Sequence, residues 1–421
     1  MNPWRTACFL AILAAFVAEP ARAYVLADTC GHQEPGCPVL HWDEGDDPIP
    51  FRLHHAGGRD LSFWSFETLT RLAFQTWAEV PTAQLEFEEG GLFFGAADFQ
   101  STDAIDNESV LFFKETGWAP RSPEVIALTS ITFAEGGVIL EADIGFNAED
   151  WAFTVGDENV QVDFLSIAVH EIGHFLGLDH SDVEGATMSA RYDEGDVSLR
   201  TLTDDDRAGI SELYPCARTP CAGEVGPGCS VLQVRSRGVL IGTLLLMSVM
   251  GLRARRRWAP LLLLAVVVAL PDSSNGSVVE ALDVDELSAR ADLVVRADVA
   301  AVNPYVAGRV RSEIHLDVTE VWKGLAPDTI VLDQEGGLLP EIGTLVFGMP
   351  QFRVGEDVVV YLDWAEGGEP RVLGMAQGKF RVVDGVPVRD LAGLSLAHRA
   401  GTPATPERLP GGLDELRLRA R

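Results

Sequence analysis

The sequence predicts an α+β domain followed by a separate all-β domain. Three segments with helical spacing of apolar residues interleave with short strand-like runs between residues 49 and 215. Residues 278–385 instead hold regularly spaced strand-like runs with Gly-rich turns, as in a β-barrel or sandwich. Two apolar runs within residues 239–270 separate these parts. At 421 residues the chain is long enough for about two to four domains.

Composition and charge exclude several classes of protein. The chain is 47% hydrophobic and 23% charged, which is close to the globular average and excludes a mostly disordered or collagen-like chain. Its 63 acidic residues against 32 Lys and Arg give a formal net charge of -31. Because that charge would repel phosphate backbones, the sequence predicts no nucleic-acid partner.

Residues 1–23 have the pattern of a signal peptide. Arg5 supplies the positive start, an apolar run extends from Ala7 to Ala18, and Ala21-Arg22-Ala23 is a small-residue cleavage site. A run of about 12 apolar residues is short for a membrane span, which favours cleavage over an uncleaved anchor. The sequence therefore predicts a secreted or cell-surface protein in an oxidising compartment.

The cysteines that follow the predicted cleavage site are odd in number, so they cannot all pair within one chain. The simplest allocation joins Cys30 to Cys37 and Cys216 to Cys221, and leaves Cys229 for sorting or lipidation. Spacing alone does not decide the connectivity. A rival hypothesis makes Cys30 or Cys37 a thiolate that blocks a metal site before activation.

The N-terminal domain is predicted element by element. Residues 24–48, rich in Pro, Gly and acidic residues, are expected to form an irregular entry segment. Thr203 is predicted to cap a helix together with Asp206 three residues on, and the Gly136-Gly137 pair predicts a hairpin. Helical spacing lies at 66–80, 162–176 and 203–214, and strand-like runs lie at 49–54, 110–113, 125–133 and 138–146.

A Cys-containing linker, residues 216–238, precedes two apolar segments at 239–270 that an Arg cluster divides. Each apolar run is short for an independent membrane span.

Three hypotheses for this segment remain open. In the first, the runs form a membrane hairpin whose arginine loop is held in the cytoplasm. In the second, Cys229 and this segment resemble the C-terminal sorting tag of myxobacterial surface proteins, which is processed near the cysteine. In the third, Met250 begins a second signal peptide, so that two exported proteins are joined in one frame. The first two predict attachment to the membrane or cell envelope through residues 239–270.

The β-rich domain, residues 278–385, has no predicted site. It contains no cysteine, and His315 is its single histidine, which argues against a metal or thiol site. Residues 386–421 form a tail that is predicted to be weakly ordered from about Thr402. The strand-like runs of the domain lie at 293–302, 310–322, 329–332, 357–362 and 379–383.

The segment from His170 to His180, HEIGHFLGLDH, carries a metal-binding motif. Residues four apart lie one turn apart on one face of an α-helix, so His170 and His174 can bind a single zinc ion. Gly177 can adopt a backbone conformation that turns the chain back and brings His180 to the same metal. Three imidazoles leave a fourth position for water, which is typical of a catalytic zinc, and Glu171 is placed to contact that water.

Residues 49–215 resemble the matrixin family of the metzincin zinc endopeptidases. The resemblance rests on HEIGHFLGLDHS at 170–181, on Met188 and on LTDDDRAGISELYP at 202–215, with AFQTWAEV and ILEADIGFN as looser matches. It implies a twisted mixed sheet with three helices, one catalytic zinc, and a Met-turn at Met188 that forms a hydrophobic base beneath the metal. It also implies that the substrate lies extended along an edge strand, here Val125–Phe133.

Departures from the family pattern bear on the other metals. Where animal matrixins carry a histidine for a structural zinc, this chain reads Gly145-Phe146-Asn147, which argues against that second zinc. Oxygen groups of Asp143, Asn147 and Asp150 are weak candidates for calcium, and turn and capping roles explain the same residues equally well.

The resemblance implies a zinc-dependent endopeptidase (EC 3.4.24 type) that hydrolyses peptide bonds in extended segments of proteins or peptides. Glu171 would take the proton of the zinc-bound water and return it to the leaving amine. The alternative is a catalytically weak surface adhesion or binding protein that keeps zinc as a scaffold. Glu171 argues against it, because a scaffold has no use for a base beside an open metal position.

Overall fold

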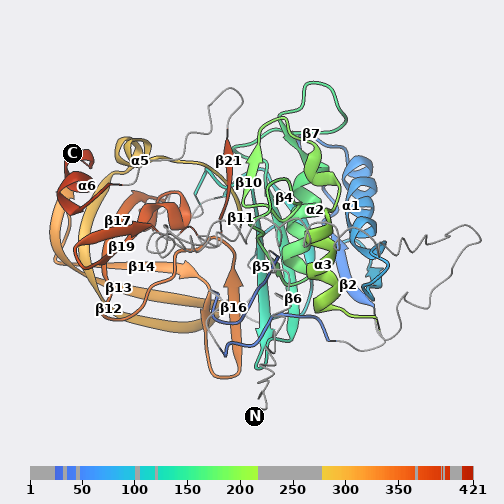
Figure 1. The fold of residues 1–421 in the computed structure, drawn as a ribbon, viewed down its shortest axis with the longest axis horizontal. Coiled ribbons are helices and arrows are strands. Elements are labelled where there is room, and N and C mark those ends of the chain that lie inside the picture. Colours follow the sequence, from blue (N-terminus) through green and yellow to red (C-terminus); the bar gives the residue numbers. More distant parts are fainter. Residues whose placement is uncertain are drawn as a thin grey trace, which may run out of the picture. The chain divides into compact units, whose positions relative to one another are not determined.

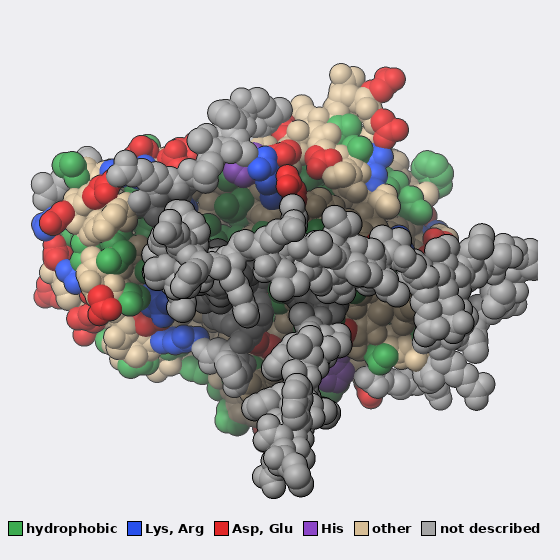
Figure 2. All heavy atoms as spheres, viewed as in Figure 1, with side chains coloured by type: hydrophobic (Ala, Val, Ile, Leu, Met, Phe, Trp, Pro, Cys, Tyr) green, Lys and Arg blue, Asp and Glu red, His purple; other side chains and the backbone are tan. Residues whose placement is uncertain are grey.

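The computed structural model describes residues 24–31, 36–43, 48–99, 105–118, 122–216, 277–365, 368–389, 391, 394–398 and 410–420. Met1–Cys216 and Ser273–Arg421 belong to one compact unit. Acidic side chains are spread over the drawn face of these residues, in keeping with the net charge (Figure 2). The predicted signal peptide, the apolar segments at 239–270, Cys221 and Cys229 lie outside the described residues. Among the described helices, none is both long and apolar enough to cross a membrane.

A mixed sheet organises the N-terminal domain (Figure 1). Its strand order is β15-β16-β5-β6-β4-β2-β3, in which β5 is antiparallel to both β6 and β16, and β4 is parallel to β6 and β2. This sheet and its helices confirm the α+β class predicted for the domain. The strands are β2 (Ile49–Leu53), β3 (Phe87–Glu89), β4 (Val110–Lys114), β5 (Ala127–Ala134), β6 (Ile139–Asn147), β15 (Gly337–Leu338) and β16 (Ile342–Val346).

Three helices accompany the sheet: α1 (Phe63–Ala78), α2 (Phe164–Phe175) and α3 (Asp204–Leu213). α1 begins three residues earlier than predicted because Ser62 caps it, its hydroxyl accepting a hydrogen bond from the Ser65 N–H at 3.1 Å. The capping box predicted at Thr203 and Asp206 is present. α2 contacts α1, β5 and β6, so the helix that bears the histidines lies in the core of the domain.

Tight turns and short strands fix the periphery of the domain. Gly136 and Gly137 both have φ of +89° in the predicted hairpin between β5 and β6. A Cβ on Gly137 would lie 2.2 Å from the Val39 carbonyl oxygen, so only glycine fits there. The short elements are β1 (Val25–Leu26), which pairs with β9 (Leu178–Asp179), β7 (Phe153–Thr154), which pairs with β8 (Val162–Asp163), β10 (Arg191–Asp193) and the 3-10 helix η1 (Ser198–Arg200).

The C-terminal part is built around its own antiparallel sheet, with strand order β14-β13-β12-β17-β19-β20 and β18 on β17. Along β17, Val360 packs into a core on one face and Tyr361 into a core on the other face, beside helix α5 (Val284–Arg290). Burial on both faces explains the nearly continuous apolar runs of these strands. The strands are β12 (Leu293–Ala307), β13 (Arg309–Lys323), β14 (Thr329–Glu335), β17 (Asp357–Trp364), β18 (Pro370–Val372), β19 (Lys379–Val383) and β20 (Val386–Arg389), and the 3-10 helix η2 spans Met375–Gly378.

Strands from the C-terminal part also join the N-terminal domain. β16 extends the N-terminal sheet at the edge of β5. A second, parallel sheet has the order β10-β21-β11, in which β21 (Leu394–His398) pairs with β10 on one side and with β11 (Ser277–Glu280) on the other. The sequence did not predict that strands of the C-terminal part pair with strands of the N-terminal domain.

The expectation of a weakly ordered tail from about Thr402 is wrong for residues 410–420. The range 386–421 contains β20, β21 and helix α6 (Leu413–Arg419). Leu416 and Ala420 are fully buried in the core shared with α5, which explains why this charged segment folds. Apolar residues four apart place one stripe of a short helix against the domain.

Candidate metal centre and catalytic cleft

The helix α2 that carries the motif is fixed firmly at its N-terminus. Asp163 caps it, accepting a hydrogen bond from the Ser166 N–H at 2.9 Å. Arg200 forms an ion pair with the buried Asp163 carboxylate, with Nη2 and Oδ1 2.6 Å apart. These two contacts hold the N-terminal end of the helix that carries His170.

His170, His174 and His180 direct their Nε2 atoms at one another. The Nε2 atoms of His170 and His174 lie 3.1 Å apart, those of His174 and His180 3.0 Å, and those of His180 and His170 2.7 Å. The Nδ1 atom of His170 lies 2.7 Å from the Thr187 carbonyl oxygen, and that of His174 2.9 Å from the Leu178 carbonyl oxygen. Since a carbonyl only accepts, Nδ1 carries the proton and Nε2 presents a lone pair.

This arrangement fits a zinc ion. Burial lowers the pKa of His180 well below its usual value, and the neighbouring His170 and His174 lower it further, so the ring is neutral. Converging lone pairs of neutral imidazoles repel one another unless a cation is shared between them. Neutral imidazole nitrogen is the form in which histidine binds zinc.

Gly177 lets the chain leave α2 in the direction of His180. Its φ is +95°, and a Cβ there would lie 2.3 Å from the Leu40 carbonyl oxygen. Only glycine combines this conformation with this approach. The Ala27 N–H donates to the Gly177 carbonyl at 2.9 Å, which ties the turn to the entry segment.

Met188, the predicted Met-turn residue, lies against the histidine helix at Gly173. It is buried, and a Cβ on Gly173 would lie 2.2 Å from its Sδ atom, so the glycine lets α2 pack closely on Met188. The Asp206 carboxylate accepts hydrogen bonds from the backbone N–H groups of Thr187 and Met188, each at 2.9 Å. The helix cap predicted at Asp206 therefore also holds the Met-turn, a role that sequence reasoning missed.

Glu171 lies on α2 next to the first histidine. Its Oε2 accepts a hydrogen bond from the Thr129 hydroxyl on β5 at 2.5 Å, and its buried Oε1 has no hydrogen-bond partner within the described residues. Burial raises the pKa of Glu171 to about 8, against the lowering effect of the Thr129 hydrogen bond and of the nearby Val278 backbone. A cation at the three imidazoles would favour the carboxylate form. Such a group can accept a proton from a water molecule at the metal.

Residues of the C-terminal part cover this centre. His170, His174 and Glu171 are 0% exposed. The Phe347 ring stacks on the His174 ring, with centroids 4.2 Å apart and an angle of 27° between the planes. The sequence gave no signal for this contact, because Phe347 lies in a short FGMP segment far from the motif and its partner cannot be read from local pattern.

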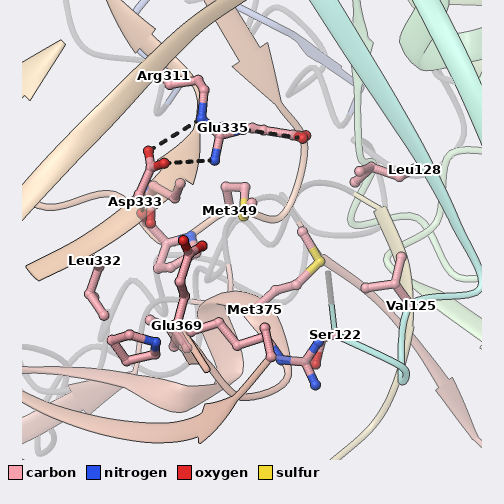
Figure 3. Close-up of a pocket in the computed structure, with 16 residues that line it drawn as sticks. Ser122, Val125, Leu128, Arg311, Leu332, Asp333, Glu335, Met349, Glu369 and Met375 are labelled. Carbon is pink, nitrogen blue, oxygen red and sulfur yellow. Dashed lines mark hydrogen bonds and ion pairs between the residues drawn. The ribbon is translucent and has the colours of Figure 1, made fainter. Parts of the chain in front are cut away.

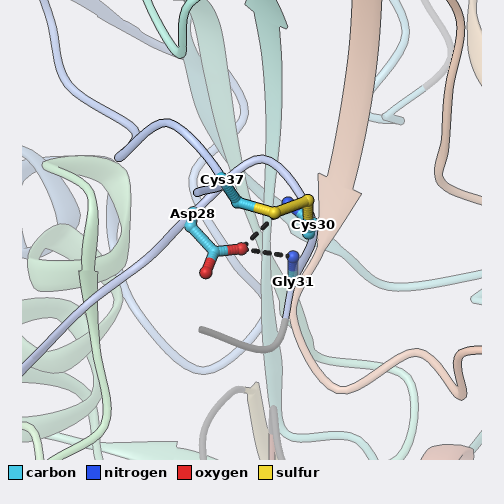
Figure 4. Close-up of a disulfide and its surroundings, with 4 residues drawn as sticks. All are labelled: Asp28, Cys30, Gly31 and Cys37. Carbon is cyan, nitrogen blue, oxygen red and sulfur yellow. Dashed lines mark hydrogen bonds between the residues drawn. A yellow bond between two sulfur atoms is a disulfide. The ribbon is translucent and has the colours of Figure 1, made fainter. Parts of the chain in front are cut away.

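The entry segment holds a second group of ligand-type side chains, Asp28, Cys30 and Cys37. Cys30 and Cys37 form a disulfide, which leaves neither sulfur as a thiolate that could block the metal (Figure 4). The Asp28 carboxylate accepts hydrogen bonds from the N–H groups of Cys30 and Gly31, at 2.8 and 2.7 Å. Cys216 is also disulfide-bonded, to a partner outside the described residues.

The three calcium candidates have other partners. Asp143 forms a buried ion pair with Arg309 of β13 and accepts a hydrogen bond from the Val110 N–H at 2.7 Å. Asn147 donates to the Val125 carbonyl at 2.8 Å and to Asp150 at 2.9 Å. Asp143 therefore serves a contact between the two parts of the chain, and the other two residues serve a turn.

The fold and the site have the pattern of the zinc metallopeptidases of the metzincin type. In it, one helix offers two histidines and a glutamate, the turn after the helix offers a third histidine, and a methionine lies underneath. Residues 41–215 match the family model described as Matrixin, so this domain is matrixin-like. The family supports zinc metallopeptidase activity and binds a catalytic zinc.

Curated relatives match the same region. The chain is 30% identical to metalloendoproteinase 4-MMP of Arabidopsis thaliana over 174 residues, which is 39% of this chain and 46% of the relative. It is 38% identical to matrix metalloproteinase-25 of Mus musculus over 128 residues, 25% of this chain and 21% of the relative. It is 42% identical to matrix metalloproteinase-2 of Drosophila melanogaster over 74 residues, 17% of this chain and 10% of the relative. The chain thus spans less than half the length of these relatives.

Proposed function

We propose that residues 41–215 act as a zinc-dependent endopeptidase on extended protein segments, with Glu171 as the general base. The observation that carries this proposal is the convergence of three imidazole Nε2 atoms beside a buried carboxylate oxygen that lacks a hydrogen-bond partner in the described structure. A structural zinc site usually has four protein ligands, whereas three histidines leave one position for water. The matrixin assignment supports the same chemistry.

The side chains of this domain divide the work of the reaction. Zinc, when bound, supplies a water of lowered pKa and polarises the scissile carbonyl. Glu171 accepts the proton of that water at Oε1 and returns it to the leaving amine, while Thr129 holds Oε2. The Thr187 and Leu178 carbonyls fix the tautomers of His170 and His174. No covalent acyl-enzyme is needed.

The expected substrate is a peptide in extended conformation. β5 lies against α2 and carries Thr129, so its outer edge passes directly beside Glu171. Backbone N–H and C=O groups along such an edge bind an extended chain with little regard to its side chains. Unfolded segments and loops of proteins can adopt that conformation, which compact folds cannot.

We also propose that the domain is exported. The Cys30–Cys37 disulfide supports an oxidising compartment, because such bonds are rare in the cytosol. Cleavage after Ala23 and membrane or cell-envelope attachment through residues 239–270 stay predictions, since both segments lie outside the described residues.

The test measures hydrolysis of an unfolded protein by the zinc-loaded chain. Because Phe347 covers His174, the chain carries Phe347→Lys, which places a buried positive charge next to the metal site and disfavours that contact. We expect hydrolysis that a zinc chelator abolishes and that Glu171→Gln removes while zinc content stays the same. An uncovered, zinc-loaded chain that cleaves nothing would instead favour a zinc-scaffolded binding protein.

A further inference from the structure

We propose that the C-terminal part of the chain is an inhibitor of the N-terminal peptidase, and that it works by filling the substrate edge with two of its own strands. The inference rests on the proposed function, since it names what regulates that site. It is carried by backbone pairing along β5 and by the covering of the histidines, two observations that are independent of catalysis.

The first segment is β16, which pairs antiparallel with β5 from Ile342 opposite Ala134 to Val346 opposite Ser130. The Phe347 N–H donates to the Thr129 carbonyl at 3.3 Å, and at the other end the Glu135 N–H donates to the Glu341 carbonyl at 3.1 Å. In an antiparallel ladder hydrogen-bonded pairs alternate, so the residues of β5 that face β16 are Thr129, Ile131 and Phe133. These are the backbone groups that an extended substrate would need.

The two faces of β16 have different roles. Leu345 and Phe347 point to the peptidase, where both pack against its core, and a Cβ on Gly343 would lie 2.4 Å from the Phe133 ring. Val346 and Thr344 point to the other face, where Val346 lies in a core that Met375 shares with Leu128 of the peptidase. The Thr344 hydroxyl lies 3.5 Å from the Thr132 hydroxyl and accepts a hydrogen bond from the Val310 N–H at 3.1 Å. Both faces of β16 therefore contact the peptidase, and the second face also contacts the C-terminal part.

The second segment is β11, at the other end of β5. The Ile126 N–H donates to the Val278 carbonyl at 2.8 Å, and the Glu280 N–H donates to the Glu124 carbonyl at 2.8 Å. Val279 forms an antiparallel bridge with Val125. β16 and β11 thus run in the same direction along one edge.

The two segments meet opposite the catalytic centre. The backbone contacts with β16 end at Thr129, whose hydroxyl binds Glu171. The backbone contacts with β11 begin at Ile126. The Ser277 hydroxyl donates to the Phe347 carbonyl at 2.7 Å, so the end of one segment touches the start of the other. After Phe347 the chain turns away at Gly348, whose φ is +80°.

The break between β16 and β11 explains how the cleft can be filled without cleavage of the inhibitor. A substrate crosses the centre as one continuous chain, with a peptide bond within reach of the water. Here the strand that follows the edge is interrupted at that point, and a hydroxyl-to-carbonyl hydrogen bond stands between the two pieces. The inhibitor therefore offers no continuous chain across the metal.

Polar contacts outside the cleft anchor the inhibitor. Arg309 is buried between the two parts, with its guanidinium donating to the Ser130 hydroxyl at 2.5 Å and forming an ion pair with Asp143. Arg290 lies 3.1 Å from both Glu124 and Glu280. Because neighbouring side chains of a strand point to opposite faces, Ser130 and Arg309 lie on the face of the sheet away from Thr129 and α2. From there Arg309 fixes the position of β13, which contacts β16.

The packing between the parts is incomplete beside these anchors. A cavity is lined by Val125 and Leu128 of the peptidase and by Met349 and Met375 of the inhibitor (Figure 3). The residues around the cavity otherwise form one buried cluster that both parts share, since Val125 and Leu128 lie in it with Val346 and Met375. Methionine adapts to irregular surroundings, so Met375 can keep contact with both parts beside the cavity. Opening the cleft therefore exposes part of a shared core.

The test compares the zinc-loaded full chain with two variants that weaken the cover. Leu345→Pro removes a backbone donor from β16, and Phe347→Lys removes the ring from His174. Val331→Lys, at a side chain 41% exposed on β14, is the matched control for the added charge. We expect kcat/KM on an unfolded protein to rise on the order of 100-fold in both cleft variants, since a tethered competitor is weakened, and to stay unchanged in the control.

Residue-resolved hydrogen exchange supplies the readout that does not depend on activity. The Ile131 N–H faces β16 and the Ser130 N–H faces β6, so the two neighbours report the two edges of β5. In the wild-type chain both amides should be protected, and in the cleft variants only Ile131 should lose protection. Unprotected Ile131 in the wild type, or hydrolysis that is measurable and equal in wild type and variants, would overturn the inference. Loss of Ile131 protection in the variants without hydrolysis by any chain would show that β16 covers the edge of β5 and would contradict the peptidase instead.

Discussion

Gly177 offers a quantitative test of how the third histidine is placed. Replacing it with alanine has two costs that the structure separates. A side chain at φ of +95° costs about 1–2 kcal/mol for the left-handed backbone. The new Cβ would also lie 2.3 Å from the Leu40 carbonyl oxygen, a backbone atom that cannot rotate away. Overpacking of this kind costs about 1–3 kcal/mol, so Gly177→Ala should destabilise the domain by about 2–5 kcal/mol.

Gly185 is the matched control for this change. Its φ is +80°, and a Cβ there would meet nothing within 4 Å. Gly185→Ala should therefore show only the backbone cost of about 1–2 kcal/mol. Urea unfolding of the two zinc-loaded variants, compared at equal m-values, measures the difference.

The refuting result for Gly177 is equal destabilisation by the two substitutions, which would mean that the Leu40 contact does not constrain the turn. Zinc affinity gives a second check, because a shifted turn moves His180 away from the other two imidazoles. Competition with a chromogenic chelator should show zinc binding weakened by about 10- to 100-fold in Gly177→Ala and unchanged in Gly185→Ala.

Other residues give further tests. In a chain opened at the cleft, Glu171→Gln should lower kcat/KM by about 10²- to 10⁴-fold with zinc content unchanged, and a smaller loss would reassign the base. Arg309→Met leaves the buried Asp143 carboxylate unpaired and should cost about 3–5 kcal/mol in urea unfolding, much of it recovered when Asp143→Asn is added. Burial raises the pKa of Asp143 from 3.8 to about 7, with Arg309 opposing the rise. Its contribution to stability is therefore complete below its unfolded pKa and lost as the pH rises toward 7, so Asp143→Asn should flatten the urea midpoint over that interval. Replacing Cys30 and Cys37 by serine should lower stability by about 2–3 kcal/mol, and an unchanged melting temperature would contradict this.

The metal centre could be read from the sequence because its signals are local. The spacing of His170 and His174 needs only the period of one helix, and Gly177 and His180 follow within one turn of chain. The cap at Thr203 likewise depends on Asp206 three residues away. Each of these predictions combines residue type and spacing within about ten positions, which is the range over which backbone geometry decides contacts.

The cover of the site could not be predicted in that way. β16 is a five-residue run, and period-two patterning shows that a strand exists without showing which strand it pairs with. Its partner β5 looked like a free substrate edge because the resemblance covered only the N-terminal domain. Helix α6 was missed for a related reason: Leu416 and Ala420 are buried by residues of α5, more than a hundred positions earlier, while the segment itself is rich in charge.

The edge of β5 gives a reason why the proposed peptidase would need the proposed inhibitor. A strand edge that binds any extended chain through backbone groups would also bind other copies and unfolded segments of its own chain, so an uncovered edge is a liability before activation. A tethered strand competes at an effective concentration of about 1 mM, whereas free peptide in the micromolar range is roughly a thousandfold more dilute. If the tethered strand and a free peptide bind β5 with equal intrinsic affinity, the tethered strand therefore keeps substrate out of the cleft while the two parts stay joined. Activation then requires that Arg309 and β16 leave the peptidase, and a cut in the chain between residues 216 and 277 would remove the tether without touching either domain.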